Sequence, residues 1–484
     1  MLFHLNGSFT DCISPIFKSG DKNNVANYRP ISLLCCVSKL LERIIYNKVI
    51  NFISNRISLT QYGFMNDRST LQQLLVFLNC IHENSKDQVD IIYLDFAKAF
   101  DRVPHNQLLL KLWSIGITND LWLWFRSYLY KRYQCVRINN SCSDYLPVLS
   151  GVPQGSILEP LLFLIYINDL ATSTQFSHVL SFADDTKCFK VISNHLDSLQ
   201  LQQDLKSLAT WSDNNHMKFN TSKFIHLRFN SKFSTSYHVN NIPITHSNTH
   251  RDLGLIISSN LSWKEHYSSI ISKAYRSLGL LRRTFSHNLH IEAKKSLYLS
   301  LVRSKLLYCS QLWNPYLLHD IAVLEQLQRR ATKFILNDYK SDYKTRLIKL
   351  HMLPLMYYYD LSDIFFIKSI KFPSSHFNIN KFVHFCEQST RSSTSNKIKH
   401  VYSSTNKHKN NYFNRLPRIY NALPAIDLDL PMNTIKFALK KYFWDHFVGN
   451  FNNNHMCTYH FVCPCCNYSR LPQQTNFTPL AITF

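Results

Sequence analysis

The chain has 484 residues, of which 45% are hydrophobic and 18% are charged. A chain of this length and apolar content can bury the cores of roughly two to four compact units, which excludes a disordered tail. Its 54 Lys and Arg residues outnumber its 31 Asp and Glu residues, and the net charge is +23. This balance favours a polyanionic partner over a merely solvated basic surface. A nucleic acid is a better candidate than an anionic membrane, because each neutralised phosphate releases condensed counterions.

Neither membrane insertion nor secretion is indicated. No apolar run approaches the roughly 18 residues that a membrane-spanning helix needs, and residues 1–17 lack the basic and apolar regions of a signal peptide. Thirteen cysteines are too few for a disulfide-stabilised scaffold in a chain of this length. We therefore expect reduced thiols, no membrane partner and an intracellular location.

The N-terminal part predicts a helix and then a buried strand. Turn-forming residues from Lys18 to Pro30 are followed by an apolar run from Ile31 to Ile50, which predicts the helix. Farther on, Val89–Leu94 is a short, β-branched run typical of a buried strand. The strand ends at Asp95, so this carboxylate is expected at the edge of a sheet.

Two further acids lie in a predicted hairpin. Val179–Phe182 and Cys188–Ile192 predict its strands, with Asp184 and Asp185 at the tip between them. Adjacent carboxylates in a buried segment repel each other and lose hydration, and a bound cation would remove that cost. Magnesium suits a few carboxylates together with substrate phosphates. A lone Asp-Asp pair is most often an ordinary turn, so its meaning depends on Asp95 upstream.

A glycine-flanked loop lies between these acids in the sequence. Gly151 and Gly155 bracket Pro153–Gln154. Glycine allows a backbone to approach a ligand closely, and the Gln154 amide can both donate and accept hydrogen bonds. A strand-end acid, such a loop and an acidic hairpin, in this order, form a constellation that chance rarely assembles.

Beyond Ser262 the pattern becomes helical, and two amphipathic segments carry basic stripes. Their apolar faces consist of Ile270, Ala274, Leu278 and Leu281, and of Leu324, Leu327, Ala331 and Phe334. Their basic stripes consist of Lys273, Arg276, Arg282 and Arg283, and of Arg329, Arg330 and Lys333. One stripe alone is most simply a solvated helix face. Two of them downstream of an acidic site favour a clamp on a nucleic-acid backbone.

Together these segments resemble the reverse transcriptases of non-LTR retrotransposons, in particular the jockey-like and chicken-repeat-like groups. The resemblance covers nearly the whole chain. It is carried by ISPIFKSGDKNNVANYRPISLLCCVSKLLERII and LTQYGFMNDRSTLQQLL in the fingers, YLDFAKAFDRVPHNQLLLKL (motif A), SGVPQGSILEPLLFLIYINDL (motif B), FADDT (motif C), LATWSDNNHMKFNTSKFIHLRF (motif D) and HRDLGLIISSNLSW (primer grip). LEQLQRRATKFI and FNRLPRIYNALP are similar to the C-terminal region of these elements.

The resemblance implies the right-hand polymerase architecture, an α+β palm with helical fingers and a helical thumb. We expect incomplete fingers in residues 1–90, the palm with finger insertions in 91–260, the thumb in 261–345 and a C-terminal region in 346–484. The implied activity is that of an RNA-directed DNA polymerase, a nucleotidyltransferase that extends a DNA primer on an RNA template from deoxynucleoside triphosphates with two Mg²⁺ ions. The nucleus and a cytoplasmic ribonucleoprotein are the expected locations.

The resemblance also implies roles for single residues. The metal ligands would be Asp95, Asp184 and Asp185, and Lys223 would donate a proton to the departing pyrophosphate. The residues expected at the incoming nucleotide are Arg29, Phe100, Gln154 and Gly155. The Phe100 ring would clash with a 2′-hydroxyl and so favour deoxynucleotides, although one more core Phe is the alternative. Lys98 and Asp101 are expected to be structural.

The sequence departs from the family pattern at three places. Glu159 stands where these proteins usually carry glycine, and its charge could weaken activity. MYYYDL (356–361) stands where paired arginines are expected. The chain begins almost at the fingers segment, so we expect a fragment that lacks the endonuclease domain of such elements.

Two alternatives remain open from the sequence. The tail residues Cys457, His460, Cys463 and Cys465 could ligate zinc, but their spacing is tight, and reduced structural cysteines are the favoured interpretation. The chain could also be a catalytically impaired, nucleic-acid-binding relic; the three acids favour the enzyme, because a relic needs none of them. A group II intron maturase would predict an intron-binding domain, which the sequence does not indicate.

Overall fold

The computed structural model describes residues 2–3, 9–285, 289–370, 377–386, 397–403, 405–423 and 428–449. The four candidate zinc ligands of the tail lie outside these residues. The chain divides into two compact units. The first consists of residues up to 73 together with 86–248, and the second of 74–85 together with the residues from 249 on.

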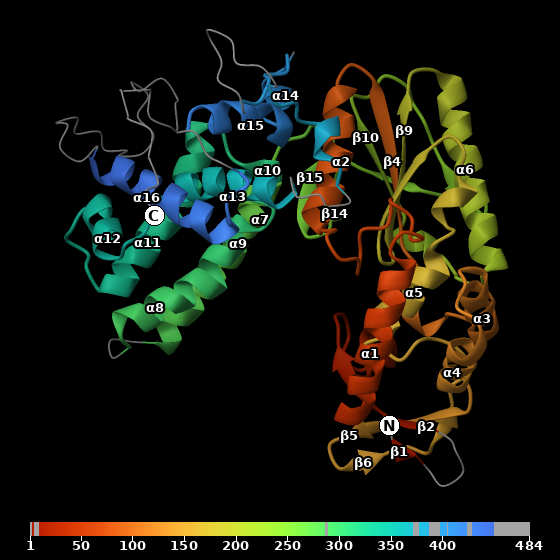
Figure 1. The fold of residues 1–484 in the computed structure, drawn as a ribbon. Helices are drawn as coiled ribbons and strands as arrows, with labels where there is room; N and C mark the ends of the chain where they lie inside the picture. The colour runs from red at the N-terminus through yellow and green to blue at the C-terminus, as the bar shows by residue number, and fades with distance from the viewer. Residues whose placement is uncertain are drawn as a thin grey trace. The chain divides into compact units, whose positions relative to one another are not determined.

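A five-stranded sheet forms the centre of the first unit. Its order is β13 (Thr245–Ser247), β10 (Ile225–Phe229), β4 (Gln88–Leu94), β9 (Asp185–Ile192) and β8 (His178–Phe182). Only β10 and β13 are parallel among these neighbours. Every residue of β4 is buried, and the strand is paired on both edges, with β10 and with β9. Helix α6 (His195–Asn214) packs along the sheet (Figure 1). The predicted α+β palm and its three predicted strands are confirmed.

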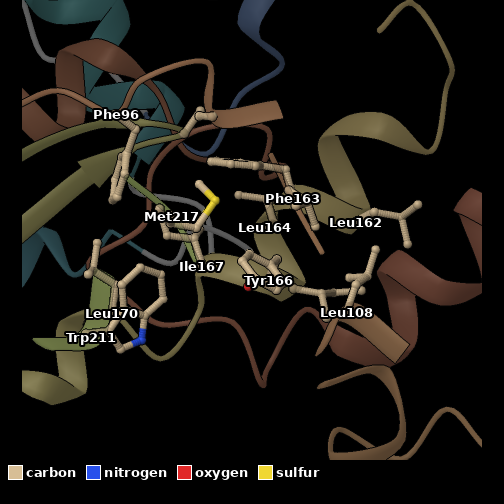
Figure 2. Packing of buried hydrophobic residues seen from close by; sticks show 14 of the residues in the cluster. Phe96, Leu108, Leu162, Phe163, Leu164, Tyr166, Ile167, Leu170, Trp211 and Met217 are labelled. Atoms are coloured by element: carbon tan, nitrogen blue, oxygen red, sulfur yellow. The ribbon is translucent and has the colours of Figure 1, made fainter. Parts of the chain in front are cut away.

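A hydrophobic core of this unit is built around α5 (Glu159–Ile167), whose residues Leu161–Ile167 are all buried. A helix that is apolar on every side belongs in the interior. Figure 2 shows Phe163 and Tyr166 of this helix among Leu108, Trp211 and other buried side chains from neighbouring elements. The Tyr166 hydroxyl donates to the Asn215 carbonyl at 2.5 Å, which ties α5 to the end of α6.

A second sheet and three helices complete this unit. The strands are β1 (Leu2–Phe3), β2 (Phe9–Phe17), β3 (Tyr28–Leu33), β5 (Arg132–Ile138), β6 (Ser141–Cys142) and β7 (Leu146–Pro147). The helices are α1 (Cys36–Ile53), α3 (His105–Ser114) and α4 (Asn119–Leu129). The predicted helix from Ile31 was wrong at its start, because residues 31–33 belong to β3 and pair with residues 12–14 of β2.

The second unit is mostly helical. It contains the hairpin of β14 (Thr249–Asp252) and β15 (Leu255–Ser258), and then α7 (Lys264–Thr284), α8 (Ile291–Tyr298), a π-helix (Leu299–Arg303), α9 (Ser304–Leu307), α10 (Ser310–Trp313), α11 (Leu318–Leu336), α12 (Tyr343–Lys349), α13 (Leu355–Ile370), α14 (Asn406–Lys409), α15 (Tyr412–Asn421) and α16 (Met432–Gly449). The predicted apolar faces of α7 and α11 are buried, except that Phe334 is half-buried. Helix α2 (Thr70–Glu83) spans the division between the units. None of the described helices is both long and apolar enough to cross a membrane.

Candidate active site

The central strands of the palm sheet bring two of the predicted acids to one edge. Strands β4 and β9 are antiparallel, and their register ends with Leu94 opposite Thr186. The next residues in line are Asp95, which follows β4, and Asp185, which begins β9. Residues opposite each other in an antiparallel pair lie about 4.5–5.5 Å apart. One further step of this register therefore places Asp95 beside Asp185.

Asp184 lies in the turn between β8 and β9. The sequence predicted Asp184 and Asp185 together at the tip, but β9 already begins at Asp185, whose partner on β8 is Phe182. The turn consists of Ala183 and Asp184, and Ala183 has a left-handed φ of 56°. The hairpin is therefore tighter than predicted, and only Asp184 is in the turn itself.

A neighbouring segment holds this turn in place. The Ala183 amide donates to Gln61 Oε1 at 2.9 Å, and the Gln61 amide donates back to the Ala183 carbonyl at 3.4 Å. The Tyr62 amide donates to the Ser181 carbonyl at 2.8 Å. A Cβ on Gly63 would lie 2.3 Å from the Ala183 nitrogen, so only glycine permits this approach. Residues 61–63 thus fix the backbone that carries Asp184.

The electrostatic environment links Asp184 to Asp95. Burial raises the pKa of the Asp184 carboxyl, and the negative charge of Asp95 raises it further. The positive charges of Lys18 and Arg29 act in the opposite direction. Arg29 is exposed on β3, where it pairs with Ile16 of β2. The two acids are therefore close enough to repel each other, and the basic residues of the β2–β3 hairpin partly compensate that repulsion.

Lys223 binds one of these acids directly. Its Nζ donates to Asp95 Oδ2 at 2.9 Å, and both side chains are partly exposed. Lys223 ends a short 3₁₀ turn that begins at Thr221, and the amide of the preceding Asn220 donates to the Asp95 carbonyl at 2.8 Å. The backbone thus positions the lysine beside the acid. The sequence predicted Lys223 as a proton donor near the site but not this ion pair.

The predicted PQG loop is fixed at both of its glycines. A Cβ on Gly151, which has φ 87°, would lie 2.7 Å from the Asp101 carbonyl oxygen. The Ser32 amide donates to the Gln154 carbonyl at 2.7 Å. A Cβ on Gly155, which has φ 97°, would lie 3.2 Å from the Ser32 carbonyl oxygen. Both glycines therefore allow the loop to lie close to neighbouring backbone.

Asp101 orients the side chain of Gln154. The Gln154 Nε2 donates to Asp101 Oδ1 at 2.7 Å. Burial raises the pKa of Asp101, and the bond from Gln154 opposes the shift. Both residues line a cavity of about 320 Å³, together with Ser32 and residues 147–153. The side chain that Asp101 fixes is a predicted nucleotide contact.

Glu159 interacts with the same loop. Its Oε2 accepts a hydrogen bond from the Gly155 amide at 2.6 Å, and it is the first residue of α5. Burial raises the pKa of Glu159 to about 7. The hydrogen bond from Gly155 opposes this rise, and the negative charge of Asp101 adds to it. The departure from glycine at this position thus places a partly desolvated carboxyl group on the loop.

Phe100 packs against the core on one side. Its ring centroid lies 4.3 Å from that of Phe163 and 6.4 Å from that of Phe64. Its carbonyl accepts a hydrogen bond from the Val152 amide at 2.9 Å. The side chain is only half-buried, so it also faces outward. This position agrees with a core role, and the side chain keeps part of its surface exposed.

The acids suit a divalent cation in their chemistry. Asp95 and Asp184 offer hard carboxylate oxygens, and their mutual repulsion is the cost that a cation would remove. Within the described residues, however, no three His, Cys, Asp or Glu side chains already form a metal-binding group. The assignment of Asp95, Asp184 and Asp185 as ligands of two ions stays a prediction.

Sequence reasoning missed the contacts by which three residues shape the site. Lys18 acts on Asp184, Gln61 holds its turn, and Asp101 orients Gln154. Gln61 lies in a segment that the resemblance already marked as part of the fingers, but nothing in the sequence pairs it with Ala183, 122 residues away.

Comparison with known proteins places this geometry in a family. Residues 18–257 match the family described as "Reverse transcriptase (RNA-dependent DNA polymerase)". The similar curated proteins include the probable RNA-directed DNA polymerase from transposon BS of Drosophila melanogaster, 27% identical over 64% of this chain and 36% of that protein. The RNA-directed DNA polymerase from mobile element jockey of the same species is 29% identical over 54% of this chain and 30% of that protein. The chain thus spans about a third of the length of these relatives.

Among solved structures, apo telomerase from Candida tropicalis is similar with a TM-score of 0.44 and 14% identity, over 78% of this chain and 69% of that one. The matched segment 18–257 contains Arg29, Asp95, Gln154 and the hairpin with Asp184 and Asp185. The chain therefore belongs to the reverse transcriptase family, in the group found in non-LTR retrotransposons.

Proposed function

We propose that this chain is an RNA-directed DNA polymerase of a non-LTR retrotransposon, which extends a DNA primer on an RNA template from deoxynucleoside triphosphates. The observation that carries the proposal is the pair of repelling carboxylates, Asp95 and Asp184, at one edge of the palm sheet. Such a pair destabilises the fold on its own. A carboxyl group whose pKa is raised by burial and by a second acid, as at Asp184, is characteristic of a site that uses it.

The acids supply the ligands in this proposal. Two Mg²⁺ ions held by Asp95, Asp184 and Asp185 would activate the primer 3′-hydroxyl and stabilise the charge that develops at the α-phosphorus. The Gln61 contacts hold the backbone of the turn that carries Asp184, which lowers the reorganisation that ligand binding requires.

The basic side chains around the acids suit a triphosphate. Lys18 and Arg29 act on Asp184 through their positive charge, and the same charge would attract phosphate oxygens. Lys223 reaches Asp95 with its ammonium group. From this position it would give a proton to the departing pyrophosphate, as its place in motif D implies.

The loop side of the site would hold the sugar and base of the nucleotide. Gln154 is fixed by Asp101, so its amide is oriented before a ligand arrives. Gly155 lets the loop lie against the backbone of Ser32, which accepts no larger residue there without a shift. Phe100, half-buried and packed against Phe163, would exclude a 2′-hydroxyl.

One observation favours the alternative of a catalytically impaired relic. Glu159 puts a carboxyl group on the Gly155 amide, and the same negative charge acts on Asp101. A charge in this place would oppose the approach of a triphosphate or of a nucleic-acid backbone. The relic would bind nucleic acid through its basic surface without turnover.

Primer extension by the purified full chain on an RNA template separates the two proposals. We expect extension with Mg²⁺, none without it, and none by Asp184→Asn. Asp213→Asn, at an exposed position of α6, is the matched control and should leave extension unchanged. Nucleic-acid binding without extension by the unaltered chain would favour the relic. Equal extension by Asp184→Asn and the unaltered chain would refute the assignment of the site.

A further inference from the structure

Glu42 is a buried acid that the proposed site does not yet use. It lies in the first half of α1, where its side chain is buried, whereas the neighbouring Leu40, Leu41 and Ile44 are exposed. An amphipathic helix ordinarily buries its apolar residues and exposes its acids. Burying a carboxylate costs free energy unless hydrogen bonds compensate the lost hydration. The contacts of Glu42 must therefore account for its position.

These contacts come from α4 and from the segment that leads into α5, both in the first unit (Figure 1). The Tyr128 hydroxyl donates to Glu42 Oε1 at 3.1 Å, and the Ile157 amide donates to Glu42 Oε2 at 2.8 Å. Burial raises the pKa of Glu42, and the bonds from Ile157 and Tyr128 oppose that rise. Among the residues that the structure describes, no cationic side chain forms an ion pair with Glu42. Neutral donors therefore hold this carboxylate.

The segment before α5 contains a closed turn. The Ser156 amide donates to the Pro153 carbonyl at 3.0 Å, so Gln154 and Gly155 are the two central residues of the turn. Gly155 has φ 97°, and a positive φ at this position is typical of a type II turn. The turn therefore presents the two residues of this loop that are predicted to contact the nucleotide.

The turn is anchored on both sides. Before it closes, the Gln154 side chain donates to Asp101 at 2.7 Å. Directly after it closes, the Ile157 amide donates to Glu42. The first anchor belongs to the turn after the strand of Asp95, and the second belongs to a different helix. Glu42 thus completes the support that Asp101 begins.

We propose that Glu42 is a positioning residue for the incoming nucleotide, because its carboxylate fixes the end of the turn that carries Gln154 and Gly155. The inference rests on the proposed function, which assigns these two residues to the nucleotide. A turn that is held on both sides keeps its central residues in place before a ligand binds, and such preorganisation raises affinity. Glu42 is buried, so it acts through the Ile157 amide. Its loss should raise the KM for the nucleotide and leave the KM for primer–template unchanged.

The test compares two variants of the full chain, Tyr128→Phe and Glu42→Met/Tyr128→Phe. Both lack the Tyr128 hydroxyl, so they differ only in the acceptor for the Ile157 amide. The double variant leaves no buried hydroxyl without a partner, and methionine resembles glutamate in length and helix propensity, so we expect it to fold. Thermal unfolding checks this.

Two further variants separate positioning from stability. Glu42→Gln is the conservative variant, since its side-chain oxygen can accept from Ile157 and its amide can donate to Tyr128. Val49→Ala is the stability control. It removes buried methyl groups from the same helix and no side-chain hydrogen bond.

Steady-state primer extension measures the effect on the nucleotide. The KM for a deoxynucleoside triphosphate should be about tenfold or more higher in Glu42→Met/Tyr128→Phe than in Tyr128→Phe. Glu42→Gln and Val49→Ala should keep the KM of the unaltered chain. Equal values in the single and double variants would overturn the proposal. So would an equal rise in Val49→Ala, or an equal rise in the KM for primer–template.

Two other measurements do not depend on turnover. Hydrogen exchange of the amides in residues 153–157 should be faster in the double variant than in Tyr128→Phe. The affinity for a fluorescent deoxynucleoside triphosphate with Mg²⁺ should be about tenfold or more lower. Unchanged exchange or unchanged affinity would overturn the role of Glu42. Absence of primer extension by the unaltered chain would instead refute the proposed function, and exchange and affinity would still decide the role of Glu42.

Discussion

The carboxyl group of Glu159 should make stability depend on pH in a measurable way. Its pKa in the folded chain is about 7, raised by burial, whereas an ordinary glutamate has a pKa of about 4.3. Between these values the folded chain binds more protons than the unfolded chain, so the free energy of unfolding falls as pH rises. The stability that protonated Glu159 contributes is present below the unfolded pKa and is lost as pH rises through about 7.

The magnitude follows from the shift. One pKa unit corresponds to about 1.4 kcal/mol, so the shift sets an upper limit of about 3–4 kcal/mol. Glu159 is only half-buried, and solvent reduces the effect to about 1–3 kcal/mol. Glu159→Gln keeps an acceptor for the Gly155 amide and removes the charge. We therefore expect this variant to be more stable than the unaltered chain by about 1–3 kcal/mol at about pH 8, and by much less at about pH 4.5.

Urea unfolding at the two pH values measures this difference. Glu265→Gln is the control, because Glu265 is also in the first turn of a helix but is exposed. Glu159→Gly additionally leaves the Gly155 amide without its acceptor, so it should be less stable than Glu159→Gln by about 1 kcal/mol. It should nevertheless raise primer extension if the charge impairs the site. A stability gain in Glu159→Gln that is equal at both pH values would refute the reasoning.

Three further predictions concern the proposed site. Lys223→Gln should lower kcat, and it should lower the Mg²⁺ concentration for half-maximal activity by up to about fivefold. The second effect arises because the exposed Lys223–Asp95 ion pair, worth about 0.2–1 kcal/mol, competes with the metal for the carboxylate. Titration of primer extension with Mg²⁺ measures both. Asp101→Ala should raise KM for the nucleotide about tenfold or more, since the Gln154 side-chain amide loses its acceptor. Asp101→Asn keeps an acceptor and should change KM little. Steady-state kinetics of both variants check this. Phe100→Val should admit ribonucleotides, measured as the ratio of dGTP to GTP incorporation.

The sequence predicted the features that depend on short, local patterns. Apolar, β-branched runs predicted strand β4 and the β8–β9 hairpin, and the ends of these strands located Asp95 and Asp184. The start of α1 was wrong because the pairing of β3 with β2 overrides the apolar pattern. Boundaries between the polymerase regions stay predictions, since the two compact units follow contacts and not sequence motifs.

Contacts between distant segments were beyond sequence reasoning for a physical reason. The Gln61–Ala183 bond joins residues 122 positions apart, and the Asp101–Gln154 bond joins residues 53 positions apart. Such bonds depend on how the chain returns in space, which no local periodicity records. The cavity that Arg329, Arg330 and Lys333 of α11 line together with Arg346 of α12 also depends on how the chain returns in space. The basic stripe of α11 was legible as a helix face, whereas its enclosure by Arg346 required the turn that brings α12 back against α11.

Phe100 has two possible roles, selection against the 2′-hydroxyl and packing of the core, and a control variant in the core can separate them. Its position five residues after Asp95 predicted a ring beside the sugar, and its contact with Phe163 at 4.3 Å makes it part of the core as well. Loss of core packing could loosen the site and relax selectivity indirectly. Phe163→Leu reduces the same packing from a fully buried position and leaves residue 100 itself unchanged.

If Phe100 excludes the 2′-hydroxyl, Phe100→Val should lower the selectivity ratio by roughly 10- to 200-fold. Phe163→Leu should then destabilise the fold by about 1 kcal/mol or more and leave the ratio unchanged. Equal changes of the ratio in both variants would mean that selectivity follows the packing of the core. An unchanged ratio in Phe100→Val would place sugar selection elsewhere in the site.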